Sequence, residues 1–469
     1  MPEILLINPK FENANSFWIP LGLAYIASYL EKNSFAVKII DANVLQINNE
    51  KVADLIKGKP DIVGISAMTS VIYSAWEIAK SIKQKFPKTL IVLGGPHPSI
   101  LPEESLKNEF IDIVVLGEGE EAMKEIAVSF RNGTIKLNEI RGIAYKTNSD
   151  EIKRTEPRPL IENLDKLPFP ARHLFPSLGK YVPEAYKRMP VATVLTSRGC
   201  PYRCTFCYAG IFGKKFRSRS PENIISEIEH LKKDFGIKEF HICDDNFFLD
   251  GKRVLRFCEL LKEKKINLPW ACVGGLRVNL VEKSPELLKL MAQTGCYRTA
   301  LGIESGNQQI LDNIQKDITL EQVRKAVKTL NKAGILVGGL FMIGNYGESE
   351  KTVDDTIRFA KSLSIDFAEF MTATPYPGTQ LYDQVLGKGH LLIKDWGEFN
   401  LWTGAVFEWD NLSKKQIDRL YRKAYVQYYF NPGFFLKSIV NFKPKSWKIY
   451  FRGFKILINN LLRYKTPMS

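Results

Sequence analysis

The segment "RGCPYRCTFCYAG", residues 198–210, places three cysteines within eight positions. A glycine and a proline beside the first cysteine keep this segment out of a regular helix. Clustered thiolates bind zinc, or they bind iron in iron–sulfur clusters. A structural zinc site takes four ligands, usually as two separated pairs, and no histidine lies between His173 and His230. Three cysteines on a four-iron cube would leave one iron without a protein ligand. The three thiols are those of Cys200, Cys204 and Cys207.

The remaining cysteines all lie downstream, and the first 199 residues contain none. An odd total of seven in a chain of 469 residues argues against a secreted disulfide framework. The first residues lack the basic and apolar regions of a signal peptide. The longest nearly apolar run, residues 334–344, is too short to span a bilayer. We therefore expect a reducing, cytoplasmic location.

The first third of the chain alternates between two patterns. Helical patterns over 21–32, 71–86 and 119–131 separate apolar, strand-like runs. This alternation predicts an α/β fold with a doubly wound parallel sheet, which binds ligands at the carboxyl ends of its strands. Loops of small residues, "SAMTS", "GGPHPS" and "GEGEE", follow three of the runs, so we predict a ligand site there. The alternative is that their glycines only make turns. The strand-like runs are 3–8, 36–41, 61–66, 89–95 and 112–117.

A second α/β region follows a predicted hairpin at 140–156 and a proline-rich linker. Six further strand-like runs alternate with helical patterns, which predicts a partial (β/α)6 barrel with its chemistry at the strand carboxyl ends. The three cysteines follow the first of these strands. Serine before proline predicts helix N-caps at Ser220 and Ser284. The domains expected are 1–139, a hairpin and linker at 140–190, the barrel at 191–390, and a helical basic region at 391–469.

The spacing Cys-x3-Cys-x2-Cys, with Phe206 before the last cysteine, resembles the signature of the radical S-adenosylmethionine (SAM) superfamily. The resemblance implies that the three thiolates hold a [4Fe–4S] cluster, that its open iron chelates SAM, and that reductive cleavage yields a 5′-deoxyadenosyl radical. The strand ends "FHICDDNFF", "ALGIESGNQ" and "GGLFMIGNYGESEKT" resemble segments that contact SAM in that family. Arg277 matches a commonly occupied position, where a structural ion pair is an equal alternative. The SAM-binding residues implied are Phe206, Asp245, Glu304, Ser305 and Gly344.

Residues 1 to about 430 resemble the cobalamin-binding branch of this superfamily, which contains the magnesium-protoporphyrin cyclase of anaerobes and the hopanoid methylases. "PLGLAYIASYLEKNSFAVKIID", "GGPHPSILPEE" and "GEGEEAMKEI" carry this resemblance, which implies a Rossmann-like cobalamin (B12) domain. No histidine has an aspartate two positions before it, so the cobalt ligand of methionine-synthase-type domains is absent or different. Loss of cobalamin is the alternative. The contacts implied are Ser66, Thr69, Gly94, Gly95, His97, Gly117 and Gly119.

The basic charge of the chain is concentrated at its C-terminal end. Residues 411–469 carry thirteen lysines and arginines against a single acidic residue, Asp418. Within 446–464 the cations fall on one helical stripe beside a broad apolar face. This pattern predicts an interfacial helix on anionic lipid, and a helix packed on the barrel is the alternative. The tail lacks the features of a nucleic-acid platform, so no nucleic-acid partner is expected.

These observations and resemblances favour a radical SAM enzyme that methylates an unactivated carbon of an apolar, lipid-like substrate with the help of cobalamin. Radical cyclisation, oxidation or carbon–carbon coupling without methyl transfer is an alternative, and so is a non-catalytic cobalamin or SAM sensor. A methylthiotransferase acting on tRNA is excluded, since that family carries a second cluster on three N-terminal cysteines. A flavodoxin or ferredoxin is the expected electron donor. The sequence assigns no catalytic side chain.

Overall fold

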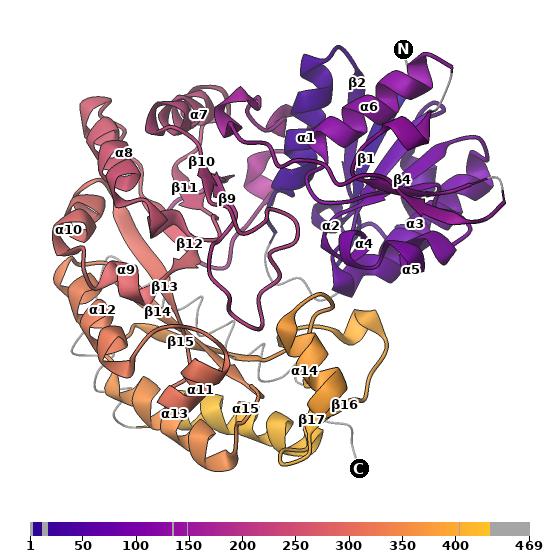
Figure 1. Ribbon diagram of the computed structural model, residues 1–469. Coiled ribbons are helices and arrows are strands. Elements are labelled where there is room, and N and C mark those ends of the chain that lie inside the picture. The colour runs from indigo at the N-terminus through magenta and orange to yellow at the C-terminus, as the bar shows by residue number, and fades with distance from the viewer. Residues whose placement is uncertain (1–2, 12–16, 134–135, 148, 403, 432–469) are drawn as a thin grey trace. The chain divides into compact units, whose positions relative to one another are not determined.

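A computed structural model describes residues 3–11, 17–133, 136–147, 149–402 and 404–431 (Figure 1). The chain forms two compact units. The first unit comprises Met1–Val182 and Tyr208–Arg217. The second comprises Pro183–Cys207 and Ser218–Ser469. Residues 208–217, which follow the last clustered cysteine, therefore belong to the first unit, although the rest of that unit ends at Val182.

Seven strands form the sheet of the first unit, in the order β2-β1-β3-β4-β5-β6-β7. Neighbours from β2 to β5 pair in parallel, whereas β6 pairs antiparallel with both β5 and β7. The hairpin expected at 140–156 thus extends this sheet and is not part of a linker. The strands are β1 (Glu3–Asn8), β2 (Ala36–Asp41), β3 (Ile62–Ser66), β4 (Leu90–Gly94), β5 (Ile113–Val115), β6 (Ile143–Lys146) and β7 (Ile152–Arg154).

Helices lie on both faces of this sheet, which confirms the doubly wound fold (Figure 1). Helix α1 packs beside α6, and α3 packs beside the short 3-10 turn Asn49–Leu55. Each long helix buries one stripe, as the period of its apolar residues requires. The helices are α1 (Leu21–Lys32), α2 (Ala42–Leu45), α3 (Ile72–Lys85), α4 (Pro96–Ile100), α5 (Pro102–Lys107) and α6 (Glu120–Arg131).

Six parallel strands form the main sheet of the second unit, in the order β15-β14-β13-β12-β11-β8. The sheet curves, and α7, α8, α10, α12 and α13 lie along its outer face, which confirms the partial (β/α)6 barrel (Figure 1). The strands are β8 (Val191–Val194), β11 (Glu239–Ile242), β12 (Trp270–Leu276), β13 (Cys296–Glu304), β14 (Leu336–Ile343) and β15 (Phe367–Thr372). Shorter strands are β9 (Ser197–Arg198), β10 (Arg217–Ser218), β16 (Gly389–Leu391) and β17 (Phe407–Trp409). The helices are α7 (Pro221–Asp234), α8 (Gly251–Glu263), α9 (Val278–Val281), α10 (Pro285–Gln293), α11 (Gln308–Asn313), α12 (Leu320–Lys332), α13 (Glu350–Ser362), α14 (Gln380–Lys388) and α15 (Lys414–Tyr429).

Aromatic side chains fill the space between this sheet and helix α8. Phe240 of β11 and Trp270 of β12 stack with ring centroids 5.8 Å apart. Phe257 of α8 meets both rings edge-on, at 6.4 and 5.7 Å. Such pairs stabilise a core beyond the area that they bury. They hold the adjacent strands β11 and β12 against helix α8.

Helix α15 covers the outer edge of β15. The Tyr425 hydroxyl accepts a hydrogen bond from the Phe370 amide at 3.2 Å and donates to the Phe370 carbonyl at 3.0 Å. The Tyr429 hydroxyl pairs in the same way with the amide and carbonyl of Ala368, at 3.1 and 2.6 Å. An edge strand exposes such groups to pairing with another chain. Two tyrosines of α15 therefore satisfy backbone groups of β15 that a seventh strand would otherwise pair with.

One of the two predicted N-caps is confirmed. Ser220 accepts from the Asn223 amide at the start of α7. Ser284 was expected to cap α10 in the same way, but this prediction is wrong. Its side chain accepts no amide hydrogen bond, and the hydroxyl instead donates to the Leu280 carbonyl of α9 at 3.1 Å. Because α9 ends only three residues before Ser284, a carbonyl of that helix is within reach of the hydroxyl.

The described part of the C-terminal region contains the β16–β17 hairpin and α15. The helix predicted over 446–464 lies outside the described residues. Among the residues that are described, no helix is long and apolar enough to cross a membrane.

The segment Tyr208–Arg217 is held in the first unit by a buried ion pair. Arg217 Nη1 lies 2.9 and 3.0 Å from the two carboxylate oxygens of Glu118, in the loop after β5. Both side chains are almost fully buried, at 1% and 4% exposure. Arg217 also donates to the carbonyls of Ile161 and Phe212, at 2.6 and 2.8 Å. These bonds tie the chain that leaves the cysteine loop to the β5 end of the first sheet.

Arg217→Met should destabilise the first unit by about 3 kcal/mol, because it leaves the Glu118 carboxylate buried without its cation. Lys215→Met is the matched control. It removes a cation from the same segment, but the Lys215–Glu162 pair is 63% exposed on both sides and should contribute under about 1 kcal/mol. Calorimetry of the two variants would measure this difference. Equal transition temperatures would contradict the anchoring role of Arg217.

Candidate cofactor sites

The cysteine loop follows β8 and β9 at the carboxyl end of the barrel sheet. The backbone of Thr205, which lies between Cys204 and Cys207, anchors it to neighbouring segments. Gly199 begins the loop with a φ of 85°, a conformation that favours glycine. The Thr205 amide donates to the Ile314 carbonyl at 3.1 Å, and the Thr205 carbonyl accepts from the Leu381 amide at 2.9 Å. Thr205 is buried, whereas Cys200 and Cys204 are half-buried and Cys207 is exposed. The three thiols therefore lie on an irregular loop that backbone hydrogen bonds to Ile314 and Leu381 hold in place.

The thiols of Cys200 and Cys207 lie close enough to Cys204 for its charge to affect their ionisation. Burial raises the pKa of Cys200 and raises that of Cys207 to about 12, and the neighbouring Cys204 thiol adds to both shifts. Thiols of this kind are protonated at neutral pH and lose their protons when they bind metal. Three clustered sulfur donors with one exposed side fit a [4Fe–4S] cluster that keeps one open corner.

Two buried cations flank this loop. Arg277, directly after β12, donates from Nη1 to the Cys204 sulfur at 3.6 Å. Its guanidinium carbon lies 3.4 Å from the centroid of the Tyr202 ring. Lys316, in the loop after α11, lies 5.7 Å from the Phe206 ring centroid. Both cations therefore face aromatic residues of the cysteine loop.

The two aspartates after β11 have different roles. Asp244 is buried and accepts from the Thr196 amide and the Ser197 hydroxyl, both at 2.6 Å. The Asp245 side chain reaches solvent, yet the surrounding protein partly desolvates its carboxyl. This desolvation, together with the Asp244 charge, raises the pKa of Asp245. It also lies near the thiols, because its charge contributes to the raised pKa of Cys200 and Cys207. Of these two carboxyl groups, Asp245 is therefore the one that reaches solvent, and its predicted contact with SAM stays a prediction.

Glu304 ends β13 in a left-handed conformation, with a φ of 67° that is rare outside glycine. Its carboxylate accepts from Lys316 Nζ at 2.6 Å in a buried ion pair. A Cβ at Gly302, two residues earlier, would lie 2.7 Å from this carboxylate and 2.8 Å from Lys316 Nζ. Glycine at this position therefore leaves room for the pair, and backbone strain at a strand end is a frequent mark of a functional site.

The loop after β14 is organised by a buried glutamate. Glu348 Oε2 accepts from the amides of Gly344 and Asn345, at 2.6 and 3.1 Å. Trp409 Nε1 donates to the Gly344 carbonyl at 2.9 Å. Gly344 adopts a φ of 99°, and burial raises the pKa of Glu348 to about 7. Sequence inspection missed Glu348, although a glutamate four residues after a strand-end glycine was a usable signal.

The carboxyl edge of the first sheet is shaped by close backbone approach. Gly95 has a φ of 109°, and a Cβ there would lie 2.6 Å from the Ala67 carbonyl oxygen. The Ala67 amide donates to the Gly94 carbonyl at 2.8 Å, and the Gly117 amide donates to Ser99 Oγ at 3.1 Å. The loops after β3, β4 and β5 therefore form one connected edge. Glycine is required at position 95 for this backbone contact, and the connected edge lies at the carboxyl ends of the strands, where doubly wound sheets bind ligands, so it fits a corrin.

Large apolar side chains are exposed at the same edge. Leu45 follows β2, and Met68 and Tyr73 follow β3, with exposed fractions of 37%, 55% and 37%. Exposed apolar groups at a ligand-binding edge indicate a surface that a ligand covers. Met68 stands beside the predicted contacts Ser66 and Thr69, but sequence inspection did not single it out.

Comparison with known proteins decides between the families that this geometry allows. A model of the B12 binding domain matches residues 11–127, and a model of the radical SAM superfamily matches residues 194–360. An uncharacterized methyltransferase of Pyrococcus horikoshii is 38% identical over 445 residues, covering 93% of this chain and 94% of that protein. The chain belongs to the radical SAM enzymes with an N-terminal B12-binding domain. Its cofactors are a [4Fe–4S] cluster, SAM and cobalamin.

Two more relatives of this radical SAM enzyme have described activities. The anaerobic magnesium-protoporphyrin IX monomethyl ester cyclase of Rubrivivax gelatinosus is 29% identical, with coverage of 91% of this chain and 79% of the relative. The cytidylyl-2-hydroxyethylphosphonate methyltransferase of Streptomyces wedmorensis is 30% identical, with coverage of 82% of each. Both proteins therefore align with most of the chain.

Two solved structures share the fold. The radical SAM methyltransferase TsrM from Kitasatospora setae, with cobalamin and a [4Fe–4S] cluster bound, superposes with a TM-score of 0.68 at 19% identity, covering 81% of this chain and 77% of that one. The cobalamin-dependent SAM radical enzyme OxsB, with aqua-cobalamin and SAM bound, gives a TM-score of 0.67 at 22% identity, covering 90% of this chain and 60% of that one.

Two of the predicted contacts of this radical SAM enzyme have buried side chains. His97 is fully buried in α4, where burial lowers its pKa to about 4 and its Nε2 lies 3.9 Å from Glu104. Ser305 is also fully buried, and its hydroxyl bonds to Thr356 Oγ1 of α13 at 3.1 Å. The side chains of both residues therefore pack within the loops in which the sequence predicted contacts.

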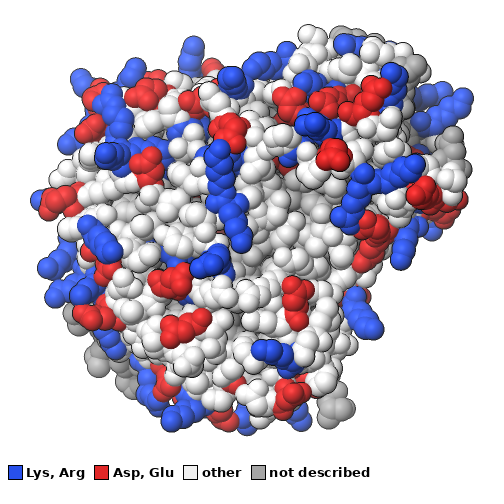
Figure 2. Space-filling view, in the orientation of Figure 1, with Lys and Arg blue, Asp and Glu red and all other residues white. Residues whose placement is uncertain are grey.

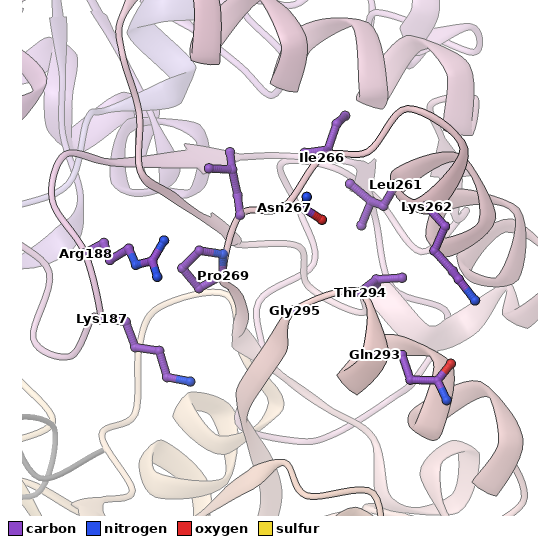
Figure 3. A pocket seen from close by; sticks show the side chains of 11 residues that line it. Lys187, Arg188, Leu261, Lys262, Ile266, Asn267, Pro269, Gln293, Thr294 and Gly295 are labelled. Carbon is purple, nitrogen blue, oxygen red and sulfur yellow. The ribbon is translucent and has the colours of Figure 1, made fainter. Parts of the chain in front are cut away.

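A cavity in the second unit lies at the other end of the barrel from the thiols (Figure 3). Pro269 and Gly295, which line it, precede β12 and β13, so the cavity opens at the amino ends of these strands. Catalytic residues of such barrels lie at the carboxyl ends. We therefore assign no role in the radical chemistry to this cavity.

Replacing Glu348 with Gln should flatten part of the pH dependence of stability. The pKa of Glu348 is about 7 in the folded protein against an ordinary value of 4.5, so the folded state binds this proton more tightly. Its contribution is fully present below pH 4.5 and is lost as the pH rises through 7, a loss of about 3 kcal/mol. Thermal unfolding from pH 4.5 to 8 should therefore show a smaller decline for Glu348→Gln than for the wild type.

The control for this measurement is Glu350→Gln, which removes an exposed carboxyl two residues along. Glu369, whose pKa burial also raises to about 7, titrates in all three proteins and cancels in the comparison. The same decline in Glu348→Gln as in the wild type would contradict the assignment.

Proposed function

We propose that this radical SAM enzyme methylates an unactivated carbon of an apolar, lipid-like substrate in a cobalamin-dependent reaction. When bound, the cluster and SAM supply a 5′-deoxyadenosyl radical that removes a hydrogen atom, and cobalamin supplies the methyl group. The observation that carries the proposal is the presence in one chain of a three-thiol loop and a strand-end edge that fits a corrin. The methyltransferase relative at 30% identity supports methyl transfer.

In this proposal, residues of the chain bind the cluster and orient SAM. Cys200, Cys204 and Cys207 hold the cluster, and the absence of a fourth cysteine on the loop leaves one iron for SAM. We expect the exposed Asp245 carboxylate to receive the SAM ammonium and Glu304 to meet the ribose hydroxyls. Lys316 holds Glu304 through their 2.6 Å ion pair. Ordered charge at these positions fixes the reacting atoms before the radical forms.

The face of the sheet that carries Glu304 and Gly302 supports an apolar substrate. Gly302 is in register with Leu340 of β14, and a Cβ at Gly275 of β12 would lie 4.0 Å from Leu340. A Cβ at Gly338 would in turn meet the Phe367 ring at 2.3 Å. Glycine at 338 lets the Phe367 ring lie against the strand, so this face presents apolar groups, against which a hydrocarbon chain can pack.

Glu369 is one of the polar positions on this face, together with Glu304 and Arg298, whose guanidinium lies 5.9 Å from the Phe367 ring centroid. Glu369 of β15 is in register with Leu340, and it accepts from Trp402 Nε1 at 3.0 Å. Burial, with the charge of Glu184 nearby, raises its pKa to about 7. A carboxyl in this state can bind a hydrogen-bond donor of the substrate. We therefore expect an apolar substrate that carries one polar group.

Radical cyclisation or oxidation is the second candidate function, because a cyclase relative covers 91% of this chain at 29% identity. That reaction would use the same thiols and the same SAM contacts. A non-catalytic sensor of cobalamin or SAM would need the loop only for binding. The three functions differ in their products.

Anaerobic reconstitution with iron and sulfide, followed by reduction with SAM, tests the proposal. The wild type should release 5′-deoxyadenosine, and Cys204→Ala should release none, since two thiolates do not hold the cluster. Cys258→Ala, which removes a buried thiol from α8 outside the loop, is the matched control and should retain product formation. A chain that binds SAM without forming 5′-deoxyadenosine would be a sensor.

Methyl transfer requires two more signals. The protein must show the absorbance of bound cobalamin, and it must release S-adenosylhomocysteine as cobalt is remethylated by a second SAM. Release of 5′-deoxyadenosine without S-adenosylhomocysteine would favour cyclisation, oxidation or coupling.

We also propose that the enzyme is cytoplasmic and receives electrons from a flavodoxin or ferredoxin. We further propose that its basic C-terminal tail binds the membrane surface. On the face shown in Figure 2, basic and acidic side chains of the described residues are interspersed. The concentration of basic charge belongs instead to the sequence from 411 onward. Anionic lipid attracts such segments.

Removing residues 434–469 should abolish sedimentation with vesicles that contain phosphatidylserine, because the basic and apolar groups of the tail would be lost together. Vesicles of phosphatidylcholine alone control for binding that does not depend on charge. If the full chain and the shortened chain bind anionic vesicles equally, the membrane proposal is wrong.

A further inference from the structure

Arg277 is a buried cation that the assigned cofactor contacts do not use. It follows β12 directly, at the start of α9, and only 7% of it is exposed. Burying a guanidinium is costly unless its donors and charge are matched. The partners of Arg277 therefore indicate why a cation is retained at this place.

Two of its nitrogen atoms reach the cysteine loop and its support. Nη1 donates to the Cys204 sulfur at 3.6 Å, and Nη2 donates to the Lys316 carbonyl. The planar group lies on the Tyr202 ring at 3.4 Å, a separation typical of stacking. The guanidinium thus spans the first half of the loop and the segment that holds it.

The third nitrogen has no partner. Nε is buried and finds no acceptor among the described residues. The carboxylate nearest to the guanidinium, that of Asp317, lies 3.9 Å from Nη2 and is 65% exposed, so solvent screens its charge. One buried N–H donor beside a cluster thiolate therefore remains available for an acceptor that the protein itself does not supply.

Among the described residues, the other charged groups around the loop do not direct a cationic donor at a cysteine sulfur. Lys316 donates to the Glu304 carboxylate at 2.6 Å, which pairs its charge with an acid. Asp245 adds negative charge beside the thiols. Of these groups, Arg277 is the one that directs a charged donor at a cysteine sulfur.

We propose that Arg277 is a positioning residue that sets the reduction potential of the cluster, by donating hydrogen bonds to the Cys204 sulfur and, through Nε, to a sulfide of the cluster. Hydrogen bonds to the sulfurs and the net charge around them are among the factors that set such potentials. The reduced cluster carries one more negative charge than the oxidised cluster. A cationic donor stabilises the reduced form more, and so it raises the potential.

This role bears directly on the radical chemistry. SAM is cleaved only after the cluster accepts an electron, so a higher potential eases reduction by the external donor. The inference rests on the proposed function in that respect. The potential itself can be measured without SAM, cobalamin or substrate, so failure of this inference and failure of methyl transfer are separate results.

The test is an anaerobic redox titration of the full-length protein with its cluster reconstituted, monitored by electron paramagnetic resonance. Arg277→Met should shift the equilibrium at least tenfold toward the oxidised cluster, which lowers the midpoint by about 59 mV for a one-electron couple. Arg277→Lys keeps a charge without the planar fork and should give a smaller shift in the same direction.

Two controls separate this role from a structural one. Tyr202→Leu removes the stacked ring and leaves the donors, so its midpoint should stay near that of the wild type. Arg256→Met removes an exposed arginine from α8 that pairs with Glu263 at 2.8 Å, and it should leave the potential unchanged. Iron content is measured for each protein, so that potentials are compared between fully loaded clusters.

The outcomes decide the proposal. A midpoint that falls in Arg277→Met and partly recovers in Arg277→Lys supports it. Midpoints equal to the wild type in both variants overturn it, and so does a shift in Tyr202→Leu as large as that in Arg277→Met. If Arg277→Met does not load iron, Arg277→Lys decides alone: a lower midpoint supports the proposal and an unchanged midpoint overturns it.

Discussion

A cube of four irons held by three thiolates leaves one iron that the protein does not ligate. Much of the second unit follows from this constraint. The loop that carries the thiols is irregular, so it must be fixed by its neighbours. Thr205 provides this by bonding to Ile314 on one side and Leu381 on the other. The barrel supplies the strand ends at which SAM contacts can face the open corner.

Charge is the second consequence of the same constraint. The thiols of Cys200 and Cys207 are protonated in the metal-free chain, because burial and neighbouring charges raise their pKa. Once deprotonated, they concentrate negative charge at one end of the barrel. Arg277 and Lys316 bring two buried cations to this end, one directed at a sulfur and one at Glu304. The cluster site therefore combines thiolate ligands with nearby cations that offset their negative charge.

The first unit has a different constraint, which is close backbone packing at the strand ends where the ligand of such a sheet binds. Gly95 approaches Ala67 so closely that no side chain fits between them. The segment Tyr208–Arg217 belongs to this unit and begins one residue after the last clustered cysteine. The buried pair of Arg217 and Glu118 fixes that segment at the β5 end. The chain therefore continues from the thiol loop directly into the cobalamin-binding unit.

Both folds and the cluster loop could be predicted from the sequence, because buried parallel strands are read as apolar runs and the cysteine spacing is local. The hairpin at 140–156 was also predicted, but its place in the first sheet was not, since strand pairing is not local. Lys316 lies in a loop without a motif, and only the fold brings it to Glu304. His97 and Ser305 stand in the expected loops, yet their side chains point into the protein, which a sequence pattern does not determine.

The most direct test of the account is whether SAM binds to the iron that the protein leaves open. Electron–nuclear double resonance on the reduced cluster, with SAM labelled with ¹⁵N at its amino group, measures this bond. The account predicts a strong ¹⁵N coupling in the wild type, which shows that the amino nitrogen ligates iron. A reduced, fully loaded cluster that shows no ¹⁵N coupling in the presence of saturating SAM would contradict it.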